Sequence, residues 1–165
     1  MMNKNFSLAC ILCFCAALPV FAQNKPIVYD TLDGWLTVGT PVQFVIEKLG
    51  EPDSVGDIET WEMSGLDYRL YQYSHRGLSF YSELVDGFER VFDITVQTGS
   101  TFHTSRGISI GDSKMSVLQR YSDSIDDEHD DEQADISVIN NIYEGTFFYY
   151  ENGKVVEIEI GALAE

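Results

Sequence analysis

The chain has 165 residues, of which 10 are basic and 27 acidic, and its formal net charge at pH 7 is −17. This charge opposes binding to nucleic acid or to an anionic membrane surface. It favours a basic partner, although acidity that only keeps the protein dispersed would have the same composition. The length suffices for one ordinary domain with its own core, whereas half of it would be marginally stable alone.

The first 22 residues have the pattern of a cleaved signal peptide. Lys4 supplies a positive charge, the stretch from Phe6 to Ala17 is almost wholly apolar, and Val20-Phe21-Ala22 ends in the small-residue pattern of a cleavage site. The apolar run is too short for a retained membrane anchor, which needs roughly 20 apolar residues. We therefore expect cleavage after Ala22 and a secreted or periplasmic protein that does not insert into the membrane.

All three cysteines, Cys10, Cys13 and Cys15, lie within this segment. The mature chain can therefore form neither a disulfide nor a thiolate metal site. A lipoprotein signal would place a cysteine after a small residue at the end of the apolar run. Cys10 stands near the start of the run and Cys15 follows Phe14, so we do not expect a lipid anchor.

After an N-terminal linker at 23–33, the chain divides into two copies of one unit, 34–106 and 107–165. Each copy opens with an alternating apolar run that ends in glycine, Leu36-Thr37-Val38-Gly39 and Ile108-Ser109-Ile110-Gly111. An amphipathic segment follows in each, from Val42 to Gly50 and from Lys114 to Ser122. Apolar residues at steps of three and four predict a short helix in both segments. The order of features repeats, which predicts an internal duplication.

The ends of these helices carry recognisable signals. Thr40 and Asp112 follow the glycines and are N-cap candidates, because their side-chain oxygens can accept from exposed backbone N–H groups. Pro41 suits the first turn, and Gly50 and Pro52 end the first helix. The core positions that we align between the helices are Val45 with Val117, Ile46 with Leu118, and Leu49 with Tyr121.

An antiparallel meander is predicted after each helix, because β-branched and aromatic residues recur with period two. The expected strands are 68–74, 77–83 and 91–96 in the first unit and 136–143, 145–151 and 155–160 in the second. Asp86-Gly87 and Asn152-Gly153 suit tight hairpins, which need positive φ angles. The side chains expected in the core are Phe80, Phe92, Ile94, Val96, Phe148, Val156, Ile158 and Ile160. The predicted fold class is α+β, with two tandem repeats that each contain a short helical segment and a β-meander.

A glycine before a short helix, the Leu-Gly-x-Pro ending from Leu49 to Pro52 and the following meander carry a resemblance. They resemble the tandem-repeat β-lactamase inhibitor proteins and the small outer-membrane assembly lipoproteins that share their fold, from Gly34 to the C-terminus. The resemblance implies a helix pair and an antiparallel sheet per unit, two sheets that form a concave surface, and protein binding in place of catalysis. The inhibitors use disulfides, which this mature chain cannot make, and Ser122 replaces the glycine that ends the second helix.

The sheet face opposite the predicted core is the candidate binding surface. Aromatic rings give buried area at low entropy cost, and carboxylates steer a basic partner towards them. The same residues would also suit an ordinary solvent-facing sheet. The candidate protein-binding residues are Tyr71, Tyr73, Tyr81, Glu83, Asp93, Phe147, Tyr149, Glu151, Glu157 and Glu159, with Thr95 between them.

The acidic run from Asp123 to Asp135 offers hard oxygen ligands, and Asp126, Glu128 and Asp130 are its calcium candidates. Its spacing does not match an EF-hand loop, and a solvated loop is the better explanation of the run. The three histidines are dispersed and have no zinc-ligand spacing; they are His75, His103 and His129. We therefore expect no metal site and no cofactor.

No nucleophile elbow, phosphate loop or zincin motif occurs in the sequence. We therefore expect a non-enzymatic binding protein for a basic protein surface. Two alternatives stay open: a small hydrolase that acts on glycans through a carboxylate pair, and a structural module with no single partner. Trp35 and Trp61 would suit a sugar-binding surface or a structural role. The ligand and the oligomeric state are not specified by these patterns.

Overall fold

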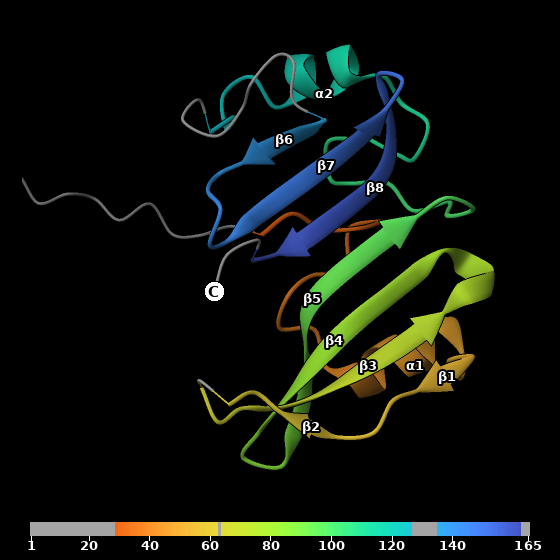
Figure 1. Cartoon of the computed structure of the whole chain (residues 1–165). Helices are drawn as coiled ribbons and strands as arrows, with labels where there is room; N and C mark the ends of the chain where they lie inside the picture. Colours follow the sequence, from red (N-terminus) through yellow and green to blue (C-terminus); the bar gives the residue numbers. More distant parts are fainter. Residues whose placement is uncertain (1–28, 63, 127–134, 163–165) are drawn as a thin grey trace, which may run out of the picture.

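The computed structural model describes residues 29–62, 64–126 and 135–162. Within these ranges, two short α-helices lie against a single antiparallel sheet of eight strands, so the fold class is α+β as predicted. Figure 1 looks onto the sheet, with α1 behind β3 and β4. The signal-peptide prediction concerns residues outside these ranges. No helix in the described part of the chain is long and apolar enough to span a membrane.

The elements follow the predicted order along the chain. The first half contains α1 (Val42–Leu49), β1 (Ser54–Val55), β2 (Glu59–Thr60), β3 (Asp67–Tyr73), the 3-10 helix η1 (Ser74–Arg76), β4 (Leu78–Val85) and β5 (Phe88–Gln97). The second half contains α2 (Lys114–Arg120), β6 (Ile136–Ile139), β7 (Gly145–Glu151) and β8 (Lys154–Gly161). Because β6 ends at Ile139, the prediction of a strand to residue 143 was too long.

The two meanders join through β5 and β8, which gives the strand order β1-β3-β4-β5-β8-β7-β6 with β2 beside β3. Ile94 pairs with Ile160 and Val96 with Ile158 at this junction. The resemblance implied two sheets and a helix pair in each unit. The described residues instead form one continuous sheet, and a single α-helix precedes each meander.

Both predicted tight hairpins are present. In the first, Asp86 and Gly87 have φ angles of 52° and 79° between the paired residues Val85 and Phe88. In the second, Asn152 and Gly153 have φ angles of 50° and 69°. Positive φ at both central residues matches the twist of the flanking strands, so these two-residue loops fix the register of each hairpin.

The helices begin at Val42 and Lys114, as predicted, but their N-caps lie one residue after the predicted ones. Pro41 is the N-cap of α1 and makes no side-chain cap, whereas Ser113 caps α2 by accepting from the N–H of Ser116. The prediction that Thr40 and Asp112 are N-caps was wrong. Their side chains instead accept from the N–H groups of Thr37 and Ser109 and close a turn before each helix. Backbone hydrogen bonds of this turn to β5 and β8 set where each helix can start.

The core lies between the helices and one face of the sheet. Val45 and Val117 are fully buried, as the helical spacing predicted. Phe80, Ile94 and Val96 pack there with their counterparts in the second half, Phe148, Ile158 and Ile160. Leu32 is also fully buried in this core although it falls in the predicted linker. Residues 29–33 of the predicted linker therefore contribute to the stability of the fold.

Two predicted core residues, Phe92 and Val156, were assigned to the wrong face. The register of β4 and β5 shifts after Tyr81, so that Asp93 pairs with Tyr81 but Val91 pairs with Ser82, and Phe92 is the extra residue. The pairing of β7 with β8 shifts in the same way after Tyr149. A β-bulge breaks the alternation of side chains. The core positions therefore go to Val91 and Val155, which are 0% and 1% exposed.

Candidate functional site

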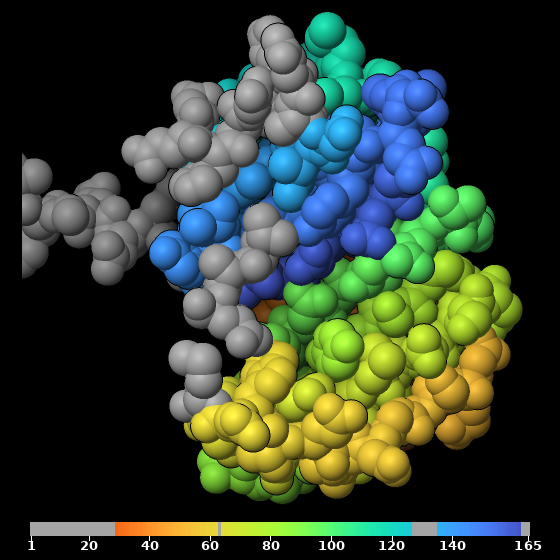
Figure 2. Space-filling view, viewed as in Figure 1, coloured from red at the N-terminus to blue at the C-terminus, as the bar shows by residue number. Residues whose placement is uncertain are grey.

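The outer face of the sheet is the face opposite α1, α2 and the core, and it is the face seen in Figures 1 and 2. Alternation along the strands and the pairing register determine which side chains it carries. The outer-face residues on the paired strands are Leu70, Gln72, Ser79, Tyr81, Glu83, Asp93, Thr95, Gln97, Ile136, Val138, Phe147, Tyr149, Glu157 and Glu159. Seven of the ten predicted binding residues are found at these positions.

Two tyrosines occupy matching positions on the outer face. Tyr81 pairs with Asp93 at the last pair before the bulge in the first hairpin, and Tyr149 pairs with Glu157 at the same place in the second. Tyr81 is 36% exposed. The Tyr149 hydroxyl donates a 2.8 Å hydrogen bond to Glu159 Oε2. Each tyrosine therefore presents an aromatic ring beside a carboxylate.

Asp93 is the most perturbed acid of this face. Its carboxylate lies over Gly161, in space that a side chain at residue 161 would fill. Burial, followed by the charges of Glu159 and Glu157, raises the pKa of Asp93 to about 7. Burial likewise raises the pKa of the Glu159 carboxyl. None of the ion pairs within the described ranges involves these acids, so their mutual repulsion is not offset by a basic side chain.

An aromatic cluster lies beside these acids. It consists of Trp61, Tyr68, Tyr81 and Phe92, whose ring centroids lie 4.6 Å apart for Trp61 and Tyr68, 5.0 Å for Trp61 and Phe92, and 5.8 Å for Tyr68 and Tyr81. No local pattern in the sequence groups these four residues. Trp61 reaches the outer face from the turn between β2 and β3, and Phe92 reaches it through the bulge. Neither placement follows from periodicity.

The prediction that Tyr71 and Tyr73 extend this surface was wrong. They are 4% and 0% exposed, because the alternation of β3 turns Leu70 and Gln72 outward and the two tyrosines inward. Tyr71 stacks on Phe80 at 4.9 Å, and burial raises its pKa to about 12. The Tyr73 hydroxyl donates to the carbonyl of Gly50, the residue after α1. Both tyrosines are core residues.

The remaining candidates differ in exposure. Phe147 has the expected register beside Val138 and Glu159 but is 0% exposed, so the prediction that it belongs to an open surface was wrong. Its burial means that this part of the outer face is covered. Glu83 is half-buried opposite Arg90, and Glu151 is exposed beside the second hairpin turn. The open part of the candidate surface is therefore centred on Tyr81, with the half-buried acids next to it.

The weaker metal hypotheses gain no support from the described residues. Among them, no group of three or more histidines, cysteines or acids could hold a metal ion. Glu128, His129 and Asp130 lie outside the described ranges. His75 pairs with Asp53 at 2.8 Å, and His103 pairs with Asp33 at the same distance. These pairs lie at the surface, where each fixes a loop conformation.

Comparison of the chain with protein-family models, with curated proteins and with solved structures gives no match. The functional conclusion therefore depends on the chemistry of the outer face itself.

Proposed function

We propose that this is an exported, non-enzymatic binding protein whose outer face recognises a basic surface of another protein. The observation that carries the proposal is the repeated pair of an outward tyrosine and a cross-strand acid, Tyr81 with Asp93 and Tyr149 with Glu157. Aromatic residues beside charged groups are typical of the residues that dominate protein interfaces.

The acids favour a cationic partner. Ionisation of Asp93 and Glu159 is unfavourable, because burial and neighbouring acids raise the pKa of each carboxyl. A lysine or arginine of a partner placed beside them would stabilise the ionised carboxylates. The open ring of Tyr81 can also attract the same cation through its π face. The net charge of −17 would speed the encounter with a basic protein.

We further propose that the two halves arose by duplication. In support, a glycine in each half, Gly39 or Gly111, donates at 2.7 Å to a carbonyl of its own meander, Val91 or Val155. Both hairpins also have a bulge after the matching tyrosine. A duplicated plan of this kind is what the resemblance to the tandem-repeat inhibitor proteins implies, and those proteins act by binding.

The experiment measures binding of the immobilised mature chain to purified basic proteins, with acidic proteins of similar size as controls. The variant Tyr81→Ala/Tyr149→Ala keeps the net charge and removes both rings. We expect at least a tenfold loss of affinity, because central aromatic residues commonly contribute 2 kcal/mol or more, roughly, to an interface. Tyr143→Ala is the matched control, since Tyr143 is 62% exposed and lies in the loop between β6 and β7.

Binding through this face should also weaken as salt rises, because screening reduces attraction between charged surfaces. If salt weakened binding by the same factor in the double variant and in the unaltered chain, the attraction would come from net charge alone and would be non-specific. If no basic protein binds better than the acidic controls, or if the double variant binds equally well, the proposal is wrong.

One observation favours a second candidate, the glycan hydrolase. Asp93, with a pKa of about 7, has the protonation that a general acid needs near neutral pH, and Glu159 is close enough to raise that pKa. Carboxyls with unequal pKa values are typical of glycosidases. Turnover of a glycan panel by the unaltered chain, abolished in Asp93→Asn, would establish this activity. Absence of both turnover and protein binding would favour a structural module.

A further inference from the structure

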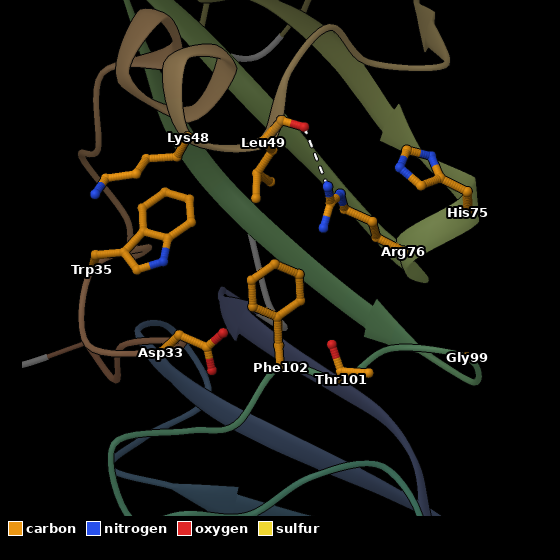
Figure 3. Close-up of a pocket in the computed structure, with 9 residues that line it drawn as sticks. All are labelled: Asp33, Trp35, Lys48, Leu49, His75, Arg76, Gly99, Thr101 and Phe102. Atoms are coloured by element: carbon orange, nitrogen blue, oxygen red, sulfur yellow. Dashed lines mark hydrogen bonds between the residues drawn. The ribbon is translucent and has the colours of Figure 1, made fainter.

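A pocket separate from the outer face opens between the end of α1, η1 and residues 98–102 (Figure 3). Its volume is about 350 Å³, within the range of small-molecule sites. Trp35, Leu49 and Phe102 form its apolar lining, and Lys48, Arg76 and Asp33 are its charged residues. Phe102 belongs to the core cluster on the helix side of the sheet, and Trp35 and Leu49 pack against that cluster. The pocket therefore lies on the opposite side from Tyr81.

The cationic side chains that line the pocket make few interactions with other residues of the protein. Arg76 Nη2 donates one 3.4 Å hydrogen bond to the carbonyl of Leu49, and the Lys48 ammonium lies 5.4 Å from the ring centroid of Phe44. Neither residue forms an ion pair within the described ranges. Only the Arg76 guanidinium is directed into the pocket, because the Lys48 side chain extends past Trp35 and away from Arg76 (Figure 3).

The acid of the pocket, in contrast, is already engaged. Asp33 Oδ1 accepts from the backbone N–H of His103 at 3.0 Å and lies 2.8 Å from His103 Nδ1. His75, which also lines the pocket, is 2.8 Å from Asp53. The charge that the pocket offers to a ligand is therefore positive, although the whole chain is strongly acidic. Figure 3 shows the Arg76 guanidinium and the Phe102 ring directed towards its centre.

At the matching place of the second half, the protein fills the space itself. Gly107 stands where the first half has Trp35, and the guanidinium of Arg120 covers it, 2.6 Å from where a Cβ would lie. Arg120 also donates to the carbonyls of Arg106 and Gly107 at 2.6 and 2.9 Å. Arg120 matches Lys48, so the matching cation is fully used there. This comparison depends on the proposed duplication, but the pocket geometry does not.

The larger residue Tyr121 takes the place of Leu49 in the second half, and its hydroxyl donates to Asp30 and, at 2.8 Å, to Thr104. Arg120 and Tyr121 thus have internal partners there. In the first half, the smaller Leu49 leaves the space open, and Lys48 and Arg76 form no ion pair within the described ranges. The first half therefore has an open pocket where the second half is filled by its own side chains.

We propose that this pocket binds a small organic carboxylate with an apolar body, such as an aryl or short aliphatic acid. The carboxylate would bind to the Arg76 guanidinium, which is directed into the pocket, since guanidinium groups form strong charge-assisted hydrogen bonds to carboxylates. The apolar part would pack on Trp35 and Phe102, where burial of apolar surface adds affinity. This binding function is independent of protein recognition by the outer face.

Trp35 gives a direct readout. The chain has two tryptophans, so the variant Trp61→Phe retains Trp35 as its single tryptophan. Titration of this variant with phenylacetate should change its fluorescence saturably. Phenylacetamide has nearly the same shape without the charge, and it should bind at least tenfold more weakly, because charge-assisted hydrogen bonds are about twice as strong as neutral ones. Calorimetry on the unaltered chain repeats the comparison without any substitution.

The guanidinium is tested in the same background. Arg76→Gln should weaken phenylacetate binding at least tenfold and leave phenylacetamide binding unchanged. Lys154→Gln removes an exposed lysine at the second hairpin and should change neither. Equal affinity for the two probes, no saturable response to phenylacetate, or full affinity for phenylacetate in Arg76→Gln would overturn the proposal. The probe comparison on the unaltered chain decides the question even if a variant does not fold. Tyr81→Ala/Tyr149→Ala should bind phenylacetate normally, so the two proposals fail separately.

Discussion

The carboxylate of Asp93 occupies the space that a side chain at Gly161 would need, where β5 and β8 join the two halves of the sheet. One residue is the most perturbed acid of the outer face and the other has no side chain. The position of the Asp93 carboxylate on the outer face therefore depends on a glycine at the junction between the two halves.

Gly161→Ala should destabilise the fold by about 1–3 kcal/mol, because the new methyl group collides with the Asp93 carboxylate. Asp93→Ala in the same chain should remove the collision and recover most of that loss. Chemical denaturation of the two single variants and the double variant gives the coupling free energy. A coupling near zero would show that the two side chains do not compete for this space.

Asp93 should make stability depend on pH. Its folded-state pKa is raised from 3.8 to about 7, so its contribution to stability is fully present below about pH 4 and is lost as pH rises through 7. Asp93→Asn should therefore be more stable than the unaltered chain at pH 8 but not at pH 4. The difference should be a few kcal/mol at most, at about 1.4 kcal/mol per pKa unit.

Thermal melting from pH 4 to pH 8 measures this effect, with Asp57→Asn at an exposed position as the control. Parallel melting curves for Asp93→Asn and the unaltered chain at every pH would contradict the prediction. If the outer face binds a basic protein, the affinity of the unaltered chain should rise between pH 6 and pH 8, since ionised Asp93 attracts the partner more strongly. Asp93→Asn should lose this dependence.

Gly145, at the start of β7, should tolerate no side chain. A Cβ atom there would lie 2.6 Å from the carbonyl oxygen of Asn141 and closer still to that of Ile139. Backbone atoms cannot move aside cheaply, so Gly145→Ala should cost more than about 2 kcal/mol. Gly56→Ala is the control, because a Cβ there would have ordinary contacts of 3.6 Å with Leu70. Equal denaturation midpoints for the two variants would contradict the assigned position of Gly145.

The bulge in β5 predicts opposite consequences for neighbouring residues. Val91 is fully buried in the core, so Val91→Ala should lower the free energy of unfolding by about 1–3 kcal/mol. Phe92 is half-buried, and its ring centroid lies 5.0 Å from that of Trp61. Phe92→Ala should therefore change the fluorescence of Trp61 but lower the free energy of unfolding less than Val91→Ala does. Denaturation followed by fluorescence separates the two effects. A larger loss of stability from Phe92→Ala than from Val91→Ala would contradict the bulge and support the regular alternation that the sequence predicted.

Much of the fold was predictable from local patterns. The helical spacing of Val45 and Val117, and the Asp-Gly and Asn-Gly pairs, predicted helices and hairpins close to their observed positions. The outward register of Tyr81 and Tyr149 was also predictable, because each follows a core phenylalanine by one residue. The inward turn of Tyr71 and Tyr73 was not, because β3 has apolar residues on both faces and its pattern gives no preferred side.

The kind of each element and its place along the chain follow from local sequence, because helix periodicity, strand alternation and turn residues are properties of short segments. Contacts between distant segments fixed the remaining features. Pairing of β5 with β8 merged the two meanders into one sheet, and the bulges moved Phe92 and Val156 out of the core. Long-range packing also set Trp35 against Lys48 and Phe102 around an open pocket. Contacts between residues far apart in sequence depend on how whole strands meet, and no local pattern records that geometry.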